Sequence, residues 1–376
     1  METWKPANSG ELATMLREAA SRNVPIAVEG QGSKKRAGGW GAAPGITIST
    51  AGLNGIQEYE PRDLTCSVGA GMPYAQFSAM LAKDGYMVPL DPPFAASATI
   101  GGVVAANSSG PRRRWFGTAR DLVIGMQFAT LEGKLVQSGG MVVKNVAGLD
   151  MAKLLIGSYG TLGVMATLNF KLIPRPSGSR TFLQTFPSAA AALAMRDELL
   201  RGVMQPVAFD VLNPAAAGRL GQPGWLAVVE AQGNKGMLGR FSKAMPSAQT
   251  LEGEAAESFW NGVREFTPGW LAEKSEGCVV RVSTKLTELA AAMEKAPGAV
   301  LARAANGVMY VHADSLVQAG PALGLGRAVV EYVPSTPVAG ADLWPKLDSG
   351  FPIMQRIKEM FDPQHLLNRG RLHGRI

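Results

Sequence analysis

Residues 90–121 read LDPPFAASATIGGVVAANSSGPRRRWFGTARD, in which two adjacent glycines stand among small residues and three consecutive arginines follow. Small side chains bury little apolar area, and glycine loses more backbone freedom on folding than any other residue. Such a run is therefore a poor way to build a core. We expect it to accommodate another molecule against bare backbone, with the prolines after Asp91 holding an extended entry to it.

Three other groups of glycines accompany this stretch, at residues 30–41, 69–71 and 157–163. Backbone N–H groups of a glycine-rich loop can converge on an anion, because no side chain blocks the approach and φ can be positive. The standard phosphate motifs are absent, since residues 30–35 lack the third glycine of GxGxxG and the Gly-Lys pair at 133–134 is followed by Leu. Any one group could be only a turn. Together they indicate a dinucleotide that lies across several loops.

Hydrophobic periodicity predicts a helix over residues 10–22 with Ser9 as its N-cap, and then a buried strand, a glycine-rich loop, further strands and another helix. A hairpin follows, turned at residues 132–133. This order indicates a mixed α+β domain and not the regular alternation of a doubly wound fold. The IPRPSGS stretch at 173–179 marks a domain boundary. Beyond it, strand-like and alanine-rich runs predict a second α+β domain with an antiparallel sheet.

With 376 residues, 46% of them apolar and 18% charged, the chain is typical of a globular protein of two domains. No apolar run reaches the roughly 18 uncharged residues that a membrane span requires, and the N-terminal residues lack the apolar core of a signal peptide. We therefore expect a cytoplasmic protein without a transmembrane segment, which a partner could hold at the membrane face. The net charge of +7 suits anionic ligands, acidic partners or nucleic acid. Basic and aromatic residues interleave only at 112–116, which argues against nucleic acid.

The two cysteines, Cys66 and Cys278, lie far apart among strand-like residues and are expected to be buried small hydrophobes. An iron–sulfur cluster usually needs about four cysteines, so this chain cannot hold one alone. The three histidines lie in the last fifth of the chain without a metal-binding spacing, and we expect no metal site.

Three stretches resemble the FAD-binding segments of the vanillyl-alcohol-oxidase (PCMH-type) flavoprotein family: VPIAVEGQGS at 24–33, DPPFAASATIGGVVAANSSG at 91–110 and KNVAGLDMAKLLIGSYGTLGV at 144–164. FDPQHLLNRGRL at 361–372 resembles the C-terminal segment of that family. The resemblance implies an α+β fold with three parts. These are a two-part FAD-binding domain over 1–175, a smaller α+β cap domain with an antiparallel sheet over 176–335, and a C-terminal helix and tail over 336–376 that packs back on the FAD domain.

The resemblance also implies which residues contact FAD. The first loop would receive the pyrophosphate on backbone donors, and the helix after Thr99 would aim its N-terminus at phosphate. The third stretch would contact the adenosine side. The residues carried over are Gly30, Gln31, Gly32 and Ser33; Asp91, Thr99, Ile100, Gly101 and Gly102; Asn107 and Gly110, toward the flavin ring; and Gly160, Thr161, Gly163 and Val164.

Three departures from the family pattern carry expectations of their own. Many relatives attach the flavin to a histidine of the first loop, but no histidine precedes His312 here, so we expect non-covalent FAD. Tyr159 replaces the glutamate usual in the family's SEGTLG stretch. The histidine-rich segment that serves substrate chemistry in larger relatives is reduced to NGVMYVHADS at 306–315.

Within the family, KNVAGLD and SGPRRR resemble the small FAD-binding component of bacterial glycolate oxidases, which works with a larger FAD-binding flavoprotein and an iron–sulfur protein of the same complex. The resemblance implies a complex that oxidises glycolate, a small 2-hydroxy acid, to glyoxylate. D-lactate is an alternative substrate, and a stand-alone oxidase that reduces O2 is an alternative arrangement.

Two interpretations of this chain's own part stay open. In the first it oxidises the substrate itself, with Arg112 or Arg371 clamping the carboxylate by bidentate hydrogen bonds and His312 as a candidate base. In the second it is a structural or electron-relay subunit that keeps the FAD fold, and the chemistry occurs on the partner. The arginines of 112–114 would then lie on a solvated or subunit-facing surface.

Overall fold

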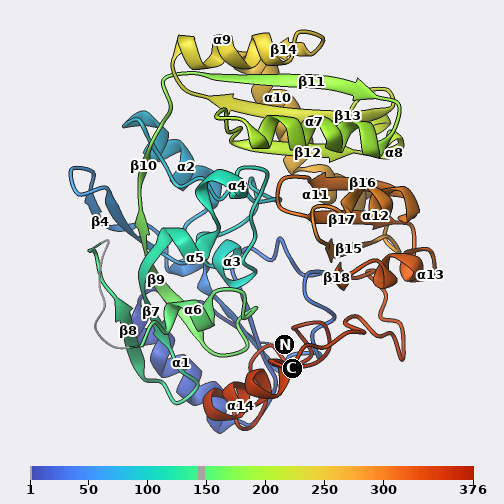
Figure 1. The fold of residues 1–376 in the computed structure, drawn as a ribbon. Coiled ribbons are helices and arrows are strands. Elements are labelled where there is room, and N and C mark those ends of the chain that lie inside the picture. The colour runs from blue at the N-terminus through green and yellow to red at the C-terminus, as the bar shows by residue number, and fades with distance from the viewer. Residues whose placement is uncertain (1, 143–148) are drawn as a thin grey trace. The chain divides into compact units, whose positions relative to one another are not determined.

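The structure is a computed structural model that describes residues 2–142 and 149–376. The chain forms two compact units (Figure 1). The first contains residues 1–109, 117–175 and 347–376, and the second contains 110–116 and 176–346. These units differ from the predicted domains in two places. Residues 110–116, which hold the three arginines, pack with the second unit, and so do residues 336–346.

A small parallel sheet opens the first unit. Its strand order is β1 (Glu2–Trp4), β3 (Ile46–Ser49) and β2 (Ile26–Glu29). Helix α1 (Ser9–Ser21) follows β1, and its N-cap is Asn8 and not the predicted Ser9, because the Asn8 side chain accepts a hydrogen bond of 2.9 Å from the Glu11 N–H. Leu12 and Leu16 of α1 are fully buried, so the helix has one apolar face.

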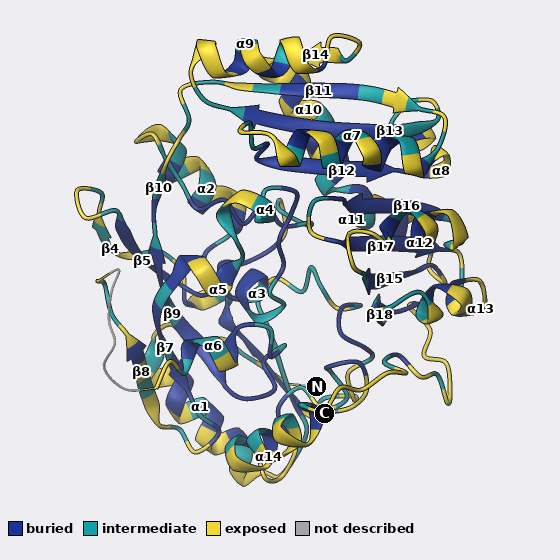
Figure 2. Ribbon diagram, in the orientation of Figure 1, coloured by how far each residue is buried: buried dark blue, intermediate teal, exposed yellow. Residues whose placement is uncertain are grey.

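The larger sheet of the first unit is antiparallel, with the strand order β4 (Ile56–Glu60), β5 (Thr65–Gly69), β9 (Val164–Lys171), β7 (Val123–Ala129) and β8 (Leu135–Gly139). β7 and β8 form the predicted hairpin, and the turn between them places Gly133 at φ +76°. Phe170 of β9 packs against Phe77 of α2 (Tyr74–Lys83) with 5.8 Å between ring centroids. Buried residues of β5, β7 and β9 form one apolar core with those of α2 and α3 (Figure 2).

The remaining elements of the first unit are short, apart from the last helix. They are η1 (Thr50–Gly52), β6 (Tyr86–Met87), α3 (Ile100–Ala105), α5 (Ala119–Leu122), α6 (Ala152–Leu155), β10 (Ile173–Pro174) and α14 (Phe351–Phe361). β6 and β10 pair in an antiparallel ribbon.

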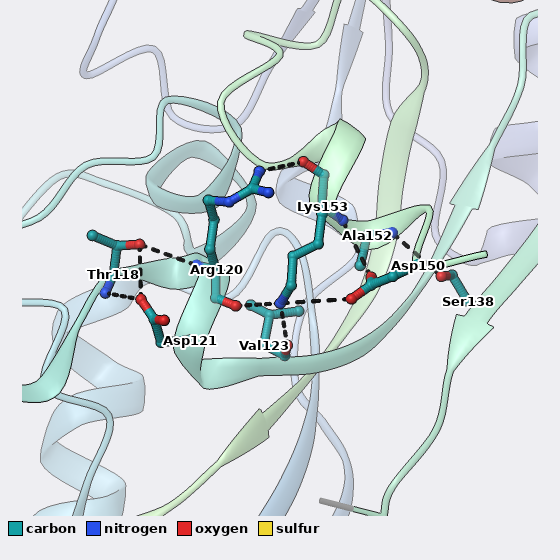
Figure 3. A network of polar contacts seen from close by, with 8 residues as sticks. All are labelled: Thr118, Arg120, Asp121, Val123, Ser138, Asp150, Ala152 and Lys153. Atoms are coloured by element: carbon teal, nitrogen blue, oxygen red, sulfur yellow. Dashed lines mark hydrogen bonds and ion pairs between the residues drawn. The ribbon is translucent and has the colours of Figure 1, made fainter. Parts of the chain in front are cut away.

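A network of polar contacts holds α6 against α5 (Figure 3). The Lys153 ammonium donates to the Arg120 carbonyl, and the Arg120 guanidinium donates in return to the Lys153 carbonyl at 2.7 Å. Asp150 and Ser138 accept hydrogen bonds from the first N–H groups of α6, each at 3.3 Å. Because α6 leads directly into residues 157–163, these contacts fix where that glycine turn begins. Of the KNVAGLD motif, residues 144–148 lie outside the described residues.

The second unit is built on one eight-stranded antiparallel sheet, in agreement with the predicted second α+β domain. Its strand order is β14 (Gln249–Leu251), β11 (Ser179–Phe186), β13 (Trp225–Gln232), β12 (Ala208–Leu212), β16 (Ala299–Arg303), β17 (Val308–Ala313), β15 (Cys278–Ser283) and β18 (Arg327–Tyr332). Its helices are α4 (Arg113–Phe116), α7 (Ala189–Arg201), α8 (Pro214–Arg219), α9 (Lys235–Ala244), α10 (Gly253–Arg264), α11 (Phe266–Glu273), α12 (Leu289–Lys295), α13 (Leu316–Ala319) and η2 (Gly320–Gly324).

The sheet of the second unit has one apolar face and one face that carries many polar residues. Phe182 belongs to the apolar face and stacks on Phe241 of α9, with 6.3 Å between ring centroids. Cys66 and Cys278 are fully buried in the first and second unit, and the prediction that they are small core residues is confirmed. Among the described residues, no helix is long and apolar enough to cross a membrane.

Candidate functional site

A pocket in the first unit brings together segments that are far apart in the sequence. Its cavity volume is about 150 Å³. Its walls are the end of β2 and the loop after it, helix α3, the turn at 157–163 and the C-terminal segment. The predicted cofactor residues that line it are Gly30, Gln31, Gly32, Ser33, Thr99, Gly101, Gly102, Gly160, Gly163 and Val164.

Two of these glycines are required by contacts within the protein. A Cβ on Gly30 would lie 2.1 Å from the Thr99 hydroxyl oxygen, and a Cβ on Gly101 would lie 2.9 Å from the carbonyl oxygen of Ala70. The Gly101 N–H donates to that same carbonyl at 2.7 Å, and the Gly102 N–H donates to the Thr99 hydroxyl at 3.2 Å. Gly30 and Gly101 therefore permit the close packing of the wall, and the N–H groups of Gly101 and Gly102 are bonded within the protein. This corrects the expectation that the start of α3 offers its amides to phosphate.

Asn368 ties two walls of the pocket together. Its amide oxygen accepts the Val28 N–H at 2.8 Å, and its amide nitrogen donates to the Tyr159 carbonyl at 2.6 Å. Tyr159 and Gly160 both have positive φ, +53° and +72°, so the turn at 157–163 has a conformation that few residues adopt without support. Asn368 lies in the quoted C-terminal segment, but the sequence reasoning selected only Arg371 there and missed it.

A buried ion pair supports the C-terminal wall. The Lys358 ammonium donates to the Asp362 carboxylate at 2.6 Å and to the Thr161 carbonyl at 2.8 Å, and Asp362 accepts the N–H groups of Leu366 and Leu367 at 2.9 and 2.7 Å. Burial lowers the pKa of Lys358, and Asp362 opposes that shift. Both side chains are almost completely buried. The pair therefore fixes the segment that carries Asn368.

Arg371 lines the pocket and holds the glycine-rich loop in shape. Its Nη1 donates to the carbonyls of Lys35 and Ala37, each at 2.7 Å, and to that of Gly39 at 3.1 Å. Burial lowers the pKa of the guanidinium, and the nearby Tyr159 and Glu29 partly oppose this. Three carbonyl acceptors on one nitrogen indicate that Arg371 clamps the loop. A substrate carboxylate would have to compete with these three carbonyl oxygens for the guanidinium.

The lining of the pocket carries more positive than negative charge. Lys34, Lys35 and Arg371 are its basic residues, and Glu29, 3.7 Å from the Lys35 ammonium, is the acidic one among the described residues. An excess of positive charge beside backbone donors suits an anionic ligand such as a pyrophosphate. Lys34 and Lys35 directly follow the predicted loop residues, which end at Ser33, and were not among the predicted site residues.

The other predicted cofactor residues do not line the pocket. Ile100 is part of the apolar core, and the Thr161 hydroxyl donates to the Ser158 carbonyl at 2.7 Å. Asp91 is buried with φ +54°. Asn107 has φ +46°, and its buried amide oxygen has no hydrogen-bond partner among the described residues. Gly110 belongs to the second unit.

His312 lies in the second unit and is 1% exposed. Its Nε2 accepts from the Thr267 hydroxyl at 2.8 Å and its Nδ1 donates to the Ala299 carbonyl at 3.2 Å, while the rings of Phe266 and Trp270 pack on it edge-on. This burial lowers the pKa of His312 to about 3, although hydrogen bonds to the backbone raise it. The ring is neutral, and both its nitrogens are occupied. This geometry indicates a structural histidine and not the candidate base.

Two of the three consecutive arginines are engaged within the second unit. Arg112 forms a bidentate pair with Glu230, at 2.9 and 3.0 Å, and Glu230 is almost completely buried. Arg114 donates to the Pro206 carbonyl at 3.2 Å and to the side chain of Gln205. The planar fork that could clamp a substrate carboxylate at Arg112 already holds a carboxylate of the protein. Among the described residues, no group of three or more metal-binding side chains is found.

Comparisons with known proteins place this geometry among flavoproteins. A family model described as an FAD binding domain matches residues 3–139. Glycolate oxidase subunit GlcE of Escherichia coli is 33% identical over 261 residues, which are 68% of this chain and 68% of that protein. Glycolate oxidase subunit GlcD of Bacillus subtilis is 29% identical over 208 residues, 55% of this chain and 44% of GlcD. A solved alkyldihydroxyacetonephosphate synthase aligns over 97% of this chain and 75% of its own, with a TM-score of 0.73 and 15% identity, which shows a shared fold.

Proposed function

Since the chain belongs to the PCMH-type FAD-binding flavoprotein family, we propose that it is the FAD-binding subunit of a multi-subunit glycolate oxidase. The complex would oxidise glycolate, a 2-hydroxy acid, to glyoxylate and pass the electrons through two partners, a larger FAD-binding flavoprotein and an iron–sulfur protein. The similarity to GlcE carries this proposal, and the similarity to GlcD supports a larger flavoprotein as the partner. The complex would lie in the cytoplasm or at the inner membrane.

The pocket of the first unit suits FAD in the charge and the small size of its lining residues. Its basic residues, Lys34, Lys35 and Arg371, suit the pyrophosphate, and the small residues of α3 leave room beside the backbone. The buried amide oxygen of Asn107, next to the end of α3, could accept a hydrogen bond from the ligand. When bound, FAD supplies two-electron, hydride-accepting chemistry. The chain's own residues would bind and orient it.

Non-covalent attachment is proposed on the residues of the same pocket. None of the described lining residues is a histidine or a cysteine. Cys66 lies in the apolar core of the first unit, and burial raises the pKa of its thiol to about 12, which leaves it a poor nucleophile. A denatured sample should therefore release all of its flavin into the supernatant, and yellow colour that stays with the precipitate would contradict the proposal.

A specific observation favours the electron-relay alternative, in which this chain leaves substrate oxidation to its partner. His312 is neutral, buried and hydrogen-bonded at both nitrogens, so it cannot take the substrate's proton without a rearrangement of the second unit. Arg112 is likewise occupied. In this alternative, the chain contributes bound FAD and the larger flavoprotein contributes the base.

Purification of the chain alone, followed by anaerobic addition of glycolate or D-lactate, separates these alternatives. A yellow protein that glycolate bleaches supports oxidation by this chain, and bleaching by D-lactate alone would change the proposed substrate. A yellow protein that neither acid bleaches, but that copurified partners reduce on addition of glycolate, supports the relay. A chain that binds no FAD after reconstitution would contradict the proposed function.

A further inference from the structure

The acidic residue of the pocket lies beside one of its lysines. Glu29 is the last residue of β2, and its carboxylate is 3.7 Å from the Lys35 ammonium. This distance is longer than a hydrogen bond between an ammonium and a carboxylate, which is usually about 2.7–2.9 Å. The Lys35 side chain is 69% exposed and the Glu29 side chain is 34% exposed. The pair is therefore loose, and water competes for both of its groups.

The backbones of Glu29 and Lys35 are held by neighbouring elements. Glu29 pairs with Ser49 of β3, and the Glu29 carbonyl accepts a hydrogen bond from the Thr50 hydroxyl at 3.3 Å. The Lys35 carbonyl accepts from Nη1 of Arg371 at 2.7 Å. Both main-chain positions are thus anchored, whereas the ion pair between the side chains can open without a change in the fold.

The Lys35 side chain lies across the loop that is predicted to receive the pyrophosphate. A Cβ on Gly32 would lie 2.7 Å from Cε of Lys35, and 3.6 Å from a carboxylate oxygen of Glu29. Gly32 has a φ of +72° and no side chain, so the ammonium and the carboxylate meet over its bare backbone. An anion bound at this loop would be attracted by the first group and repelled by the second.

The other two basic residues of the lining have different surroundings. Nη1 of Arg371 donates to three carbonyls, and the Lys34 ammonium lies 5.6 Å from the ring centroid of Phe94. Burial lowers the pKa of the Arg371 guanidinium, and the charge of Glu29 opposes that shift. Lys35 is the lining cation that forms an ion pair with this carboxylate. Glu29 therefore balances part of the positive charge that a bound pyrophosphate would otherwise balance.

We propose that Glu29 competes with the pyrophosphate of the ligand for the Lys35 ammonium. When the ligand binds, Lys35 turns from the carboxylate to a phosphate oxygen, and the carboxylate stays nearby as a repelling charge. Glu29 thereby weakens the binding of the cofactor and favours its release, so that bound FAD exchanges with free FAD. The inference deepens the proposed function and rests on it, because it concerns how the same pocket takes FAD.

The test is isothermal titration calorimetry of the full chain, freed of flavin, with inorganic pyrophosphate and with FAD. Glu29→Gln should lower the Kd for both probes about fivefold, because it removes the repelling charge and releases Lys35. Lys35→Met should raise both Kd values about fivefold, because it removes the attracting charge. Glu58→Gln in β4 and Lys83→Met in α2 change the net charge equally at exposed positions outside the pocket lining. These two controls should leave both Kd values near those of the wild type.

The double variant shows whether Glu29 acts through Lys35. Beside Lys35→Met, Glu29→Gln should lower the Kd only about twofold, because direct repulsion of the phosphate is all that remains. An equal effect of Glu29→Gln in both backgrounds would overturn the competition.

Two further outcomes would also overturn the inference. One is a Glu29→Gln variant that binds FAD more weakly but pyrophosphate as before, because Glu29 would then hold a hydroxyl group of the cofactor. The other is a wild type that binds neither probe. A wild type that binds pyrophosphate but not FAD contradicts the proposed function alone, because the pyrophosphate titrations of the variants are independent of FAD.

Discussion

The pocket of the first unit is lined by glycines, small side chains and backbone, whereas the polar face of the second unit's sheet is lined by arginines and their paired carboxylates. In the pocket, the ion pair of Lys358 and Asp362 lies beneath one wall and supports it. On the sheet face, the paired groups are part of the face, and Asp210, Glu230 and Arg303 are themselves buried. One region thus exposes its backbone toward the pocket, and the other pairs buried carboxylates with arginines of the same unit.

The contrast also concerns how each region is assembled. The glycines of the pocket lie in short runs that can be recognised in the sequence, although Gly30 is required by Thr99 and Gly101 by Ala70. The pairs of the sheet face join residues far apart in the sequence, 118 positions for Arg112 and Glu230 and 93 for Arg303 and Asp210. Substitutions of the supporting ion pairs and of the residues beside them test this contrast.

The largest effect is expected in the first unit, at Asp362. Asp362→Ala leaves the Lys358 ammonium buried without its carboxylate and removes the acceptor of two backbone N–H groups. Breaking a buried pair in this way costs about 3–5 kcal/mol of the free energy of unfolding. Urea denaturation measures it, with Glu359→Ala, on the exposed side of α14, as the control. A loss below about 1 kcal/mol would mean that the pair does not support the wall.

A smaller effect is expected in the second unit, and it separates two neighbouring arginines. Arg112→Met leaves the buried Glu230 without its bidentate partner and should lower the free energy of unfolding by about 2 kcal/mol, less than at Asp362 because Arg112 is partly exposed. Arg113→Met should change it by about 0.5 kcal/mol or less. Equal losses in both variants would show that Arg113 also has a structural role, against the contrast between the two arginines.

His312 gives the second unit a dependence on pH that the pocket does not share. The folded pKa is about 3 and the ordinary value is 6.5, so between these values the unfolded chain binds the proton and the folded chain does not. Stability from this residue is present above pH 6.5 and is lost as the pH falls. Between about pH 7 and pH 5 the loss should be about 2 kcal/mol.

Urea denaturation at several values between about pH 7 and pH 5 measures this dependence. His312→Gln should remove the part of the pH dependence of the free energy of unfolding that the histidine causes. His365→Asn, at an exposed histidine of the first unit, should not. A slope that is the same in wild type and His312→Gln would mean that the ring is protonated in the folded chain.

The smallest effect is expected on cofactor affinity, at Asn368. Asn368→Asp keeps the acceptor for the Val28 N–H but turns a carboxylate oxygen toward the Tyr159 carbonyl. The Kd for FAD, measured by flavin fluorescence, should rise about tenfold, the value of one hydrogen bond of this kind. Arg369→Gln changes the net charge equally at the adjacent exposed position and should leave the Kd near that of the wild type. If both variants raise the Kd for FAD equally, the change in net charge and not the loss of the Asn368 hydrogen bond explains the effect.

The sequence predicted the α+β class, the antiparallel second domain, the hairpin at 132–133 and the segments that line the pocket. These features depend on neighbouring residues, such as glycine spacing and apolar periodicity. It did not predict Lys34 or Asn368 as lining residues. Lys34 lies one position beyond the motif that carried the resemblance, and Asn368 reaches the pocket only because Lys358 and Asp362 hold its segment against β2 and the turn.

Residues 90–121 show which features the sequence alone can predict and which it cannot. The small residues at 95–106 could be predicted from composition to form a wall for a ligand, and part of this stretch does line the pocket. The three arginines after them could not be told apart by any local property, since they are identical and adjacent. Only the folded chain pairs Arg112 with the Glu230 carboxylate and gives Arg114 the Pro206 carbonyl and the Gln205 side chain. The role of an arginine depends on which carboxylate lies close to it, and only the tertiary structure brings the two groups together.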